Sequence, residues 1–293
     1  MNAIVLMASG RKYLRDLAVA KASFELYAKR CHATLAICDT PPDPTFKRNI
    51  LCQKMLVPHL FRQYEWIAFC DTDILISKAA PSIFEYIDDD RAFSAVVDER
   101  GSEKFVNVVR NLWKQPEILN ETHDSYFSSR GFPDHPFAKA SINGGVWLCR
   151  PAKIADELRR VYFSDLAPGS THEEPLMAYV SQKNGLFYEL DPRFNRQFLY
   201  ELFTPPQSPV TEELGSLYFR AFQRLHARTH PPSFLYPKAY RARVNEALSR
   251  SYFLHFCGGF PYVNIRSDQE IGAGSGKQGL PVQLLGGRKR GSP

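Results

Sequence analysis

The stretch YEWIAFCDTDILIS, residues 64–77, places two carboxylates directly after an apolar run. Residues 66–70 have the length and composition of a buried strand, and Asp71 and Asp73 follow at its end. Side chains two residues apart in an extended chain point the same way, so both carboxylates are expected on one side. Ligands of open α/β sheets bind beyond the carboxyl ends of the strands. The stretch therefore predicts a ligand site at a sheet edge.

Two close carboxylates repel each other unless a cation lies between them. Mg²⁺ or Mn²⁺ takes oxygen ligands of this kind and leaves coordination positions open for the oxygens of a diphosphate. The alternative is that one of Asp71 and Asp73 caps a turn while the other is solvated, with Thr72 a loop residue between them. The five apolar residues before the pair favour the metal site, because an unpaired charge beside a buried strand is costly.

Apolar runs of strand length recur through the first two thirds of the chain, with helix-length segments between several of them. The runs are residues 4–8, 34–38, 66–70, 92–97, 145–149 and 186–190. Residues 14–30 show an apolar helical face with a basic end, and residues 46–62 are interpreted as a second helix. Strand, helix and strand in alternation predict an open α/β sheet with crossover helices.

The composition sets limits on the class of protein. The chain has 293 residues, of which 44% are hydrophobic and 23% charged, which excludes wholesale disorder. No apolar run approaches the roughly 18 residues of a membrane helix. The first apolar run has no basic residue before it, which favours a strand over a secretion signal and leads us to expect a cytoplasmic protein. Six cysteines without a CxxC pair are interpreted as reduced thiols, and neither a zinc site nor a disulfide framework is favoured.

The net charge of +6 suits an anionic partner such as a nucleotide or a membrane surface. Basic residues do not cluster with aromatic ones in the first 260 positions, so nucleic acid is not expected. Residues 198–250 are aromatic and proline-rich, and we interpret them as a helical elaboration and candidate acceptor region. Residues 266–293 are rich in glycine and end in a basic cluster, and we interpret them as a flexible basic tail with peripheral membrane contact as its alternative role.

Several motifs together resemble the retaining nucleotide-sugar glycosyltransferases of family 8, which have the A-type fold and include glycogenin. The stretch 64–77 resembles their DxD segment, and five further motifs follow the family order. These are KMLVP (54–58), SINGGVWL (141–148), EEPLM (173–177), LDPRFN (190–195) and HFCG (255–258). The resemblance spans roughly residues 1–262, and we expect the catalytic domain to comprise residues 1–265. It implies one Rossmann-like nucleotide-diphospho-sugar transferase domain, with a mixed central sheet and helices on both faces.

The resemblance also implies a function and its partners. A hexose would pass from a nucleoside diphosphate sugar, such as a UDP-sugar, to a hydroxyl of a glycan, lipid-linked glycan or protein, with retention. Mn²⁺ or Mg²⁺ would be held by Asp71, Asp73 and His255. The sequence departs from the family in two places: residues 259–262 lack the lysine that usually follows the last motif, and Glu173 stands where a glutamine is usual.

Each remaining candidate has a functional and a structural interpretation. His255 would complete the metal site, or would be a core histidine bonded to the backbone. Asn143, Gly144 and Gly145 would let a sugar approach the backbone, or would form a turn. One of Glu173 and Glu174 would cap a helix, which leaves the other free to act at the reacting centre.

The donor site is expected to include residues from several strand ends. Lys54 would meet the phosphates, and Asp39 would bind the base or ribose or begin a turn. The expected donor-binding residues are Ala8, Ser9, Asp39, Lys54, Asp71, Thr72, Asp73, Gly144, Gly145 and Gly258, and the expected catalytic residues are Asn143, Glu173 and Glu174.

Two other classes of protein fit part of the pattern. A binding module of the same fold would hold a nucleotide or glycan without turnover, as the missing lysine and Glu173 suggest. A phosphatase of the haloacid-dehalogenase type also uses Asp-x-Asp after a strand, but it has Thr or Val where this chain has Leu75, and the motif then lies near the start of the chain.

Overall fold

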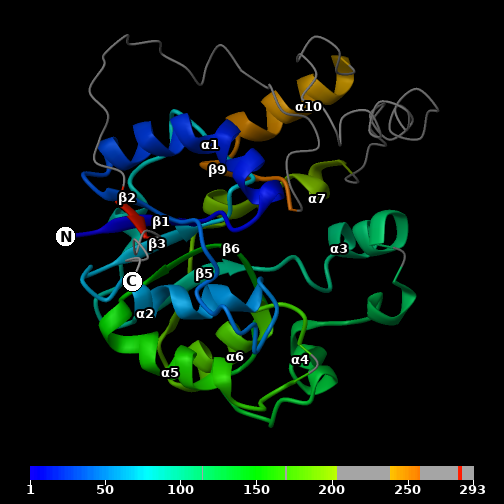
Figure 1. Ribbon diagram of the computed structural model, residues 1–293. Coiled ribbons are helices and arrows are strands. Elements are labelled where there is room, and N and C mark those ends of the chain that lie inside the picture. The colour runs from blue at the N-terminus through cyan, green and yellow to red at the C-terminus, as the bar shows by residue number, and fades with distance from the viewer. Residues whose placement is uncertain (114, 169, 203–237, 258–282, 286–293) are drawn as a thin grey trace.

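The computed structural model describes residues 1–113, 115–168, 170–202, 238–257 and 283–285, and its centre is a seven-stranded sheet (Figure 1). The strand order is β10-β2-β1-β3-β6-β5-β7. The strands are β1 (Ala3–Met7), β2 (Thr34–Cys38), β3 (Ile67–Cys70), β5 (Phe93–Val97), β6 (Ile142–Cys149), β7 (Phe187–Glu189) and β10 (Gln283–Leu285). β1 pairs in parallel with β2 and β3, while β6 runs antiparallel to β3 and β5. The predicted mixed sheet is confirmed.

Helices cover both faces of this sheet (Figure 1). α1 (Arg11–Arg30) lies on one face, and α5 (Pro151–Phe163) and α6 (Glu174–Lys183) lie on the other. Side chains alternate along β1, so Ile4 belongs to the core on the α1 side and Val5 to the core on the α5 side. Burial on both faces explains why these strands are continuously apolar.

The segment expected as one helix over residues 46–62 is mostly a loop. Only a 3-10 helix, η1 (Cys52–Leu56), and the short α2 (Val57–Leu60) form there. Asp43 accepts hydrogen bonds from the backbone of Thr45 and Lys47, and Phe46 has a positive φ of 52°. These local bonds and the left-handed residue exclude a helix before Cys52.

A second, three-stranded sheet brings distant parts of the chain together. It consists of β4 (Ile74–Ile76), β9 (Phe253–His255) and β8 (Arg196–Gln197), in the order β4-β9-β8. β4 and β9 are antiparallel, and Ile74 lies opposite His255. The residue after Asp73 is thereby registered against His255, although the two are far apart in sequence.

The remaining elements are short. They are η2 (Ile83–Tyr86), α3 (Glu103–Val108), the π-helical turn η3 (Val109–Trp113), η4 (Pro116–Ile118), α4 (His123–Tyr126), η5 (Ser128–Arg130), η6 (Pro192–Asn195), α7 (Phe198–Leu202) and α10 (Lys238–Ser249). Within the expected tail, residues 266–293, Gln283–Leu285 pair in parallel with β2 as an edge strand, and the other residues of the tail lie outside the described part of the chain. Of the described helices, none is both long and apolar enough to span a bilayer.

Candidate active site

A cleft of about 500 Å³ opens beyond the carboxyl ends of β3 and β5. Its volume is within the range of ligand pockets. The residues predicted from the sequence that line it are Lys54, Asp71, Thr72, Asp73, Asn143, Gly145, Glu173, Glu174 and His255. Further lining residues include Lys12, Tyr13, Asp98, Arg100, Trp113, Tyr126, Arg130, His172, Gln197, Tyr200 and Cys257. The topology thus brings together the motifs that are separated in sequence.

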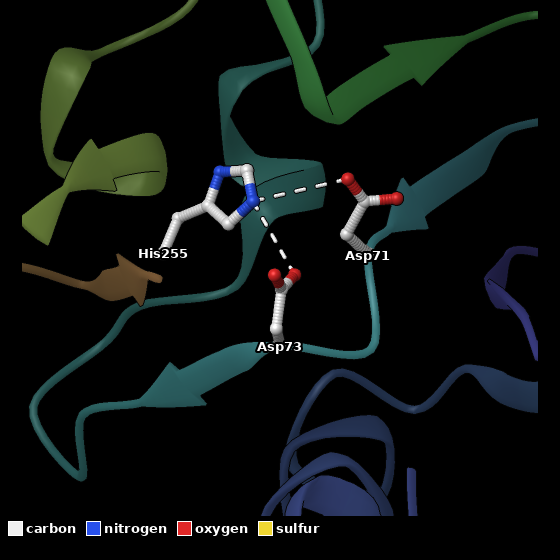
Figure 2. Close-up of side chains that lie close together, drawn as sticks. All are labelled: Asp71, Asp73 and His255. Atoms are coloured by element: carbon white, nitrogen blue, oxygen red, sulfur yellow. Dashed lines mark ion pairs between the residues drawn. The ribbon is translucent and has the colours of Figure 1, made fainter. Parts of the chain in front are cut away.

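Asp71, Asp73 and His255 all line the cleft, and their side chains point toward one another (Figure 2). The Nε2 atom of His255 lies 3.3 Å from Asp73 Oδ1 and 3.8 Å from Asp71 Oδ2. One ligand atom from each residue lies within 4.8 Å of the others. Asp71 leaves the end of β3, Asp73 precedes β4, and His255 ends β9, so both sheets contribute to the cluster.

This cluster fits a hard or borderline divalent cation. Ligands at about 2.1 Å from one octahedral ion lie about 3 Å from each other, which is close to the observed separations. Two carboxylates and one imidazole suit Mn²⁺ or Mg²⁺, and three protein ligands leave further positions for a bound substrate. The described residues therefore provide a candidate metal site at the predicted place.

The ionisation of the cluster reflects its excess of negative charge. Burial raises the pKa of Asp71, and nearby Asp73 raises it further, against the opposing effect of Lys54. Burial opposes the charged imidazolium of His255, but Cys257 and Asp73 outweigh this effect and raise the pKa of His255 well above its usual range. In the metal-free protein His255 therefore carries a proton that faces the carboxylates.

Lys54 is buried behind the metal cluster. Its Nζ lies 2.9 Å from Asp71 Oδ1 and 2.8 Å from Glu173 Oε1. Burial lowers the pKa of Lys54, but Asp71 and Glu173 reverse the effect and raise it above its ordinary value. Lys54 thus holds two carboxylates in place, a role that sequence reasoning did not assign to it.

The adjacent acids Glu173 and Glu174 have different environments. Glu173 is 2% exposed and pairs with Lys54. Glu174 begins α6, and its Oε1 accepts a hydrogen bond from the backbone N–H of Gly144 at 2.8 Å. Burial and the neighbouring Glu173 raise the pKa of Glu174 to about 7. Glu173 is therefore held by its ion pair with Lys54, whereas Glu174 is the one with a pKa near neutrality.

The glycines of β6 are required by the site itself. A Cβ on Gly145 would lie 2.2 Å from Cε1 of His255, and one on Gly144 would lie 2.4 Å from Oε1 of Glu173. The sequence prediction attributed this need to a ligand, whereas the structure shows that protein side chains occupy the space. Asn143 adjoins them and lines the cleft.

A second group of lining residues, which we call the second wall of the cleft, was missed by sequence reasoning. Asp98 follows β5 and accepts hydrogen bonds from Tyr200 Oη at 3.0 Å and Arg100 Nη2 at 3.1 Å. Arg100 also pairs with Glu121, and its guanidinium lies 4.5 Å from the ring centre of Tyr126. The position of Asp98 at the end of a predicted strand, like that of Asp71, was the available signal.

Four predicted donor-binding residues do not line the cleft as described. Ala8 and Ser9 follow β1, and Asp39 follows β2 with a buried Oδ1 that has no hydrogen-bond partner among the described residues. Gly144 contacts Glu174 through its backbone. Gly258 lies outside the described residues. In the aromatic stretch after Phe198, Tyr200 lines the cleft, while residues 203–237 also lie outside the described part of the chain.

A mixed sheet with an Asp-x-Asp pair at a strand end, next to a histidine from the three-stranded sheet, agrees with the A-type fold expected from the family resemblance. Neither a protein-family model nor a curated protein matches the sequence. Among solved structures, the chain is similar to the bifunctional glycosyltransferase WbbM, at 9% identity over 87% of this chain and 45% of that one, with a TM-score of 0.51. This likeness shows a shared fold.

Two further glycosyltransferases of known structure are similar over most of their length. One is involved in the glycosylation of the major capsid of PBCV-1, with 14% identity, coverage of 92% of this chain and 97% of that chain, and a TM-score of 0.47. The other is the galactosyltransferase LgtC, determined with donor and acceptor sugar analogs, with 13% identity, coverage of 88% and 87%, and a TM-score of 0.46.

Proposed function

We propose that the protein is a metal-dependent glycosyltransferase that moves a hexose from a nucleoside diphosphate sugar to an acceptor hydroxyl. The observation that carries the proposal is the Asp71–Asp73–His255 cluster, with ligand atoms within 4.8 Å, inside a cleft of about 500 Å³. A UDP-sugar is the proposed donor, and the family resemblance adds retention of configuration. The shared fold favours this reaction over the phosphatase alternative.

In this proposal each residue has a distinct task. Asp71, Asp73 and His255 would hold Mn²⁺ or Mg²⁺, which when bound supplies positive charge for the diphosphate leaving group. Lys54 would keep the Asp71 carboxylate ionised and aimed at the cation. Glu174, with a pKa near neutrality, would exchange a proton with the acceptor hydroxyl.

We assign the acceptor to the wall formed by Asp98, Arg100, Trp113, Tyr126 and Tyr200. Asp98 can accept hydrogen bonds from sugar hydroxyls, and the ring of Trp113 offers a face for stacking. The sequence predicts the acceptor site in residues 198–250, whereas this assignment places it closer to α3 and α4. Tyr200 belongs to the expected region and to the newly assigned wall. A glycan, free or attached to a lipid or protein, fits such a wall, and membrane contact and a cytoplasmic location remain proposals from the sequence.

The test is an assay of UDP-sugar hydrolysis by the full chain with Mn²⁺, with Mg²⁺ and with a chelator. We expect metal-dependent release of UDP, which Asp73→Asn abolishes. NMR of the sugar product after addition of an acceptor would show the anomeric outcome. Absence of turnover for every nucleotide sugar, with and without acceptors, contradicts the proposal. Mn²⁺-dependent UDP binding without any product would instead identify a binding module.

A further inference from the structure

A chain of hydrogen bonds connects His255 to the backbone of β6. The backbone N–H of Gly145 donates to Asn143 Oδ1 at 3.0 Å. Nδ2 of Asn195 lies 2.7 Å from the same Asn143 oxygen. On its other side, Oδ1 of Asn195 lies 2.9 Å from Nδ1 of His255, and both of these residues are buried. Three side chains from β6, η6 and β9 are thus linked behind the metal cluster.

The direction of each bond in this chain follows from the backbone N–H of Gly145, whose role as a donor is fixed. A backbone N–H only donates, so the Asn143 atom that faces Gly145 must be its oxygen. The Asn195 atom that faces this oxygen must then be its NH₂ group, which turns the Asn195 oxygen towards His255. An amide oxygen only accepts, so Nδ1 of His255 must carry a hydrogen.

We propose that Asn195, oriented by Asn143, is a positioning residue that fixes His255 with its hydrogen on Nδ1 and its Nε2 lone pair directed at Asp71 and Asp73. The carboxamide oxygen of Asn195 accepts the Nδ1 hydrogen, so the ring is held in one orientation. The inference rests on the metal site of the proposed function, but the location of the hydrogen can be tested without metal.

Gly145 contributes to this arrangement twice. Its N–H begins the chain of bonds, and the missing Cβ leaves room for the His255 ring, whose Nδ1 would otherwise lie 2.5 Å from that Cβ. Asn195 and Asn143 are therefore not interchangeable with other polar residues. An oxygen is needed at the one position that faces the imidazole, and an NH₂ group at the position that faces Asn143.

The direct test is the protonation of His255 by long-range ¹H–¹⁵N NMR on the full chain labelled at histidine. In wild type, under conditions where the ring is neutral, we expect the hydrogen on Nδ1 and none on Nε2. Asn195→Leu preserves the volume but removes the acceptor oxygen, and it should give a mixture of both neutral tautomers. Asn195→Asp restores an acceptor and should retain the Nδ1 hydrogen. A wild-type Nε2–H tautomer, or no change in Asn195→Leu, overturns the assignment.

A second readout is Mn²⁺ affinity, measured from the free-ion EPR signal without any sugar donor. Loss of a group that orients a metal-bound histidine typically weakens metal binding by about 10–100-fold, so we expect a loss of this size for Asn195→Leu and a smaller one for Asn195→Asp. In a His255→Ala background, Asn195→Leu should have no further effect. An equal loss in both backgrounds would show a merely structural role and contradict the proposal.

The two readouts separate this inference from the proposed function. If wild type does not bind Mn²⁺, the metal-dependent function is wrong, and the NMR experiment alone decides the tautomer. If Asn195→Leu does not fold, Asn143→Leu serves in its place, because it leaves Asn195 present but removes the oxygen that orients it. Asn143→Leu should then lose the Nδ1–H preference, and retention of that preference would overturn the proposal.

Discussion

The two walls of the cleft differ in their balance of acidic and basic side chains. On the metal wall, Lys54 pairs with Asp71 and Glu173, and Asp73 lies in one cluster with Asp71. On the second wall, Asp98 lines the cleft, and Asp98 and the nearby buried Glu121 are matched by two arginines. Arg100 contacts both acids, and Arg130 binds Glu121 with Nη2 at 3.2 Å from Oε2. One wall has surplus negative charge and the other is balanced.

This difference indicates that the two walls would bind groups of different charge. On the metal wall, Lys54 and the imidazolium of His255 offset only part of the negative charge, and a bound cation would complete the balance. On the second wall, ion pairs hold each group in a fixed direction. Under the proposed function, this wall would bind an uncharged, hydroxyl-rich acceptor through hydrogen bonds to Asp98. Variants that remove charge from each wall test this contrast.

Lys54→Met should destabilise the metal-free protein by about 3–5 kcal/mol, because it leaves Asp71 and Glu173 buried without their cation. Mn²⁺ should restore part of this loss by supplying charge on the same wall. Arg100→Met is the matched control, since it removes a buried cation from the balanced wall and Mn²⁺ should not rescue it. Denaturant unfolding with chelator and with Mn²⁺ measures both. If Mn²⁺ restored the stability of both variants equally, the proposed difference between the two walls would be wrong.

Asp73→Asn should weaken Mn²⁺-dependent UDP binding at least about 100-fold, since it removes a charged ligand from a cluster of three. The fold should persist, because loss of one carboxylate relieves repulsion with Asp71. Calorimetry of UDP binding and thermal unfolding measure the two effects. Asp98→Asn, on the balanced wall, should retain UDP affinity, and a comparable loss there would contradict the assignment of the metal.

Glu174→Gln should change how stability depends on pH. The pKa of Glu174 is raised from 4.5 to about 7, so the folded protein binds this proton more tightly than the unfolded chain. The resulting stability is complete below about pH 4.5 and is lost as the pH rises to about 7. At about 1.4 kcal/mol per pH unit, the metal-free variant should gain about 2–3 kcal/mol on wild type across this window. Parallel stability curves for the two proteins would exclude the shift.

Mn²⁺ affinity should rise with pH in the absence of donor. The raised pKa of His255 means that a proton must leave Nε2 before the cation binds, so affinity should increase up to about tenfold per pH unit below that pKa. The ion pair between protonated His255 and Asp73 is present at low pH and is lost as the pH rises through the folded-state pKa. Mn²⁺ titrations from pH 6 to 8.5 measure the slope, and His255→Ala should flatten it. A steep slope in that variant would point to another proton.

Trp113→Ala should raise the acceptor KM by about fivefold and leave donor hydrolysis unchanged, since stacking of a ring on a sugar contributes about 1 kcal/mol. Trp113 lines the cleft and packs edge-on against Phe105 at 5.9 Å. Steady-state kinetics with saturating donor separate the two substrates. Equal losses in acceptor transfer and donor hydrolysis, with a lower Tm, would show that Trp113 only supports α3.

The sequence was sufficient for the sheet and for the Asp71–Asp73 pair because their signals are local, whereas His255 was added through the family resemblance. A buried strand followed by Asp71 and Asp73 is recognisable within ten residues, and six strands were expected close to where they occur. The role of Lys54 was not recognisable, because its pairing with Glu173 depends on how the fold brings η1 to the start of α6. The helix expected over residues 46–62 failed for a local reason, the turn built around Asp43.

The balanced wall could not be predicted because it depends on tertiary pairing. Arg100 and Glu121 are ordinary surface-type residues in the sequence, and only the packing of α4 against the loop after β5 buries them together. Asn195 is similar, because its motif was visible but its partner His255 lies 60 residues further along the chain. Long-range hydrogen bonds of this kind have no periodic signature.

The ladder between β4 and β9 has a consequence for how this chain can vary in length. Ile74 opposite His255 sets the spacing of the metal ligands by strand register, independently of the chain that connects them. Insertions or deletions between Ile76 and Phe253 can therefore alter the loops around the cleft while Asp73 and His255 keep their relative position. A shift of the β4–β9 register by two residues, by contrast, would move His255 away from Asp73. Two short strands thus fix the relative position of the proposed metal ligands Asp73 and His255, while the loops around the cleft can differ in length.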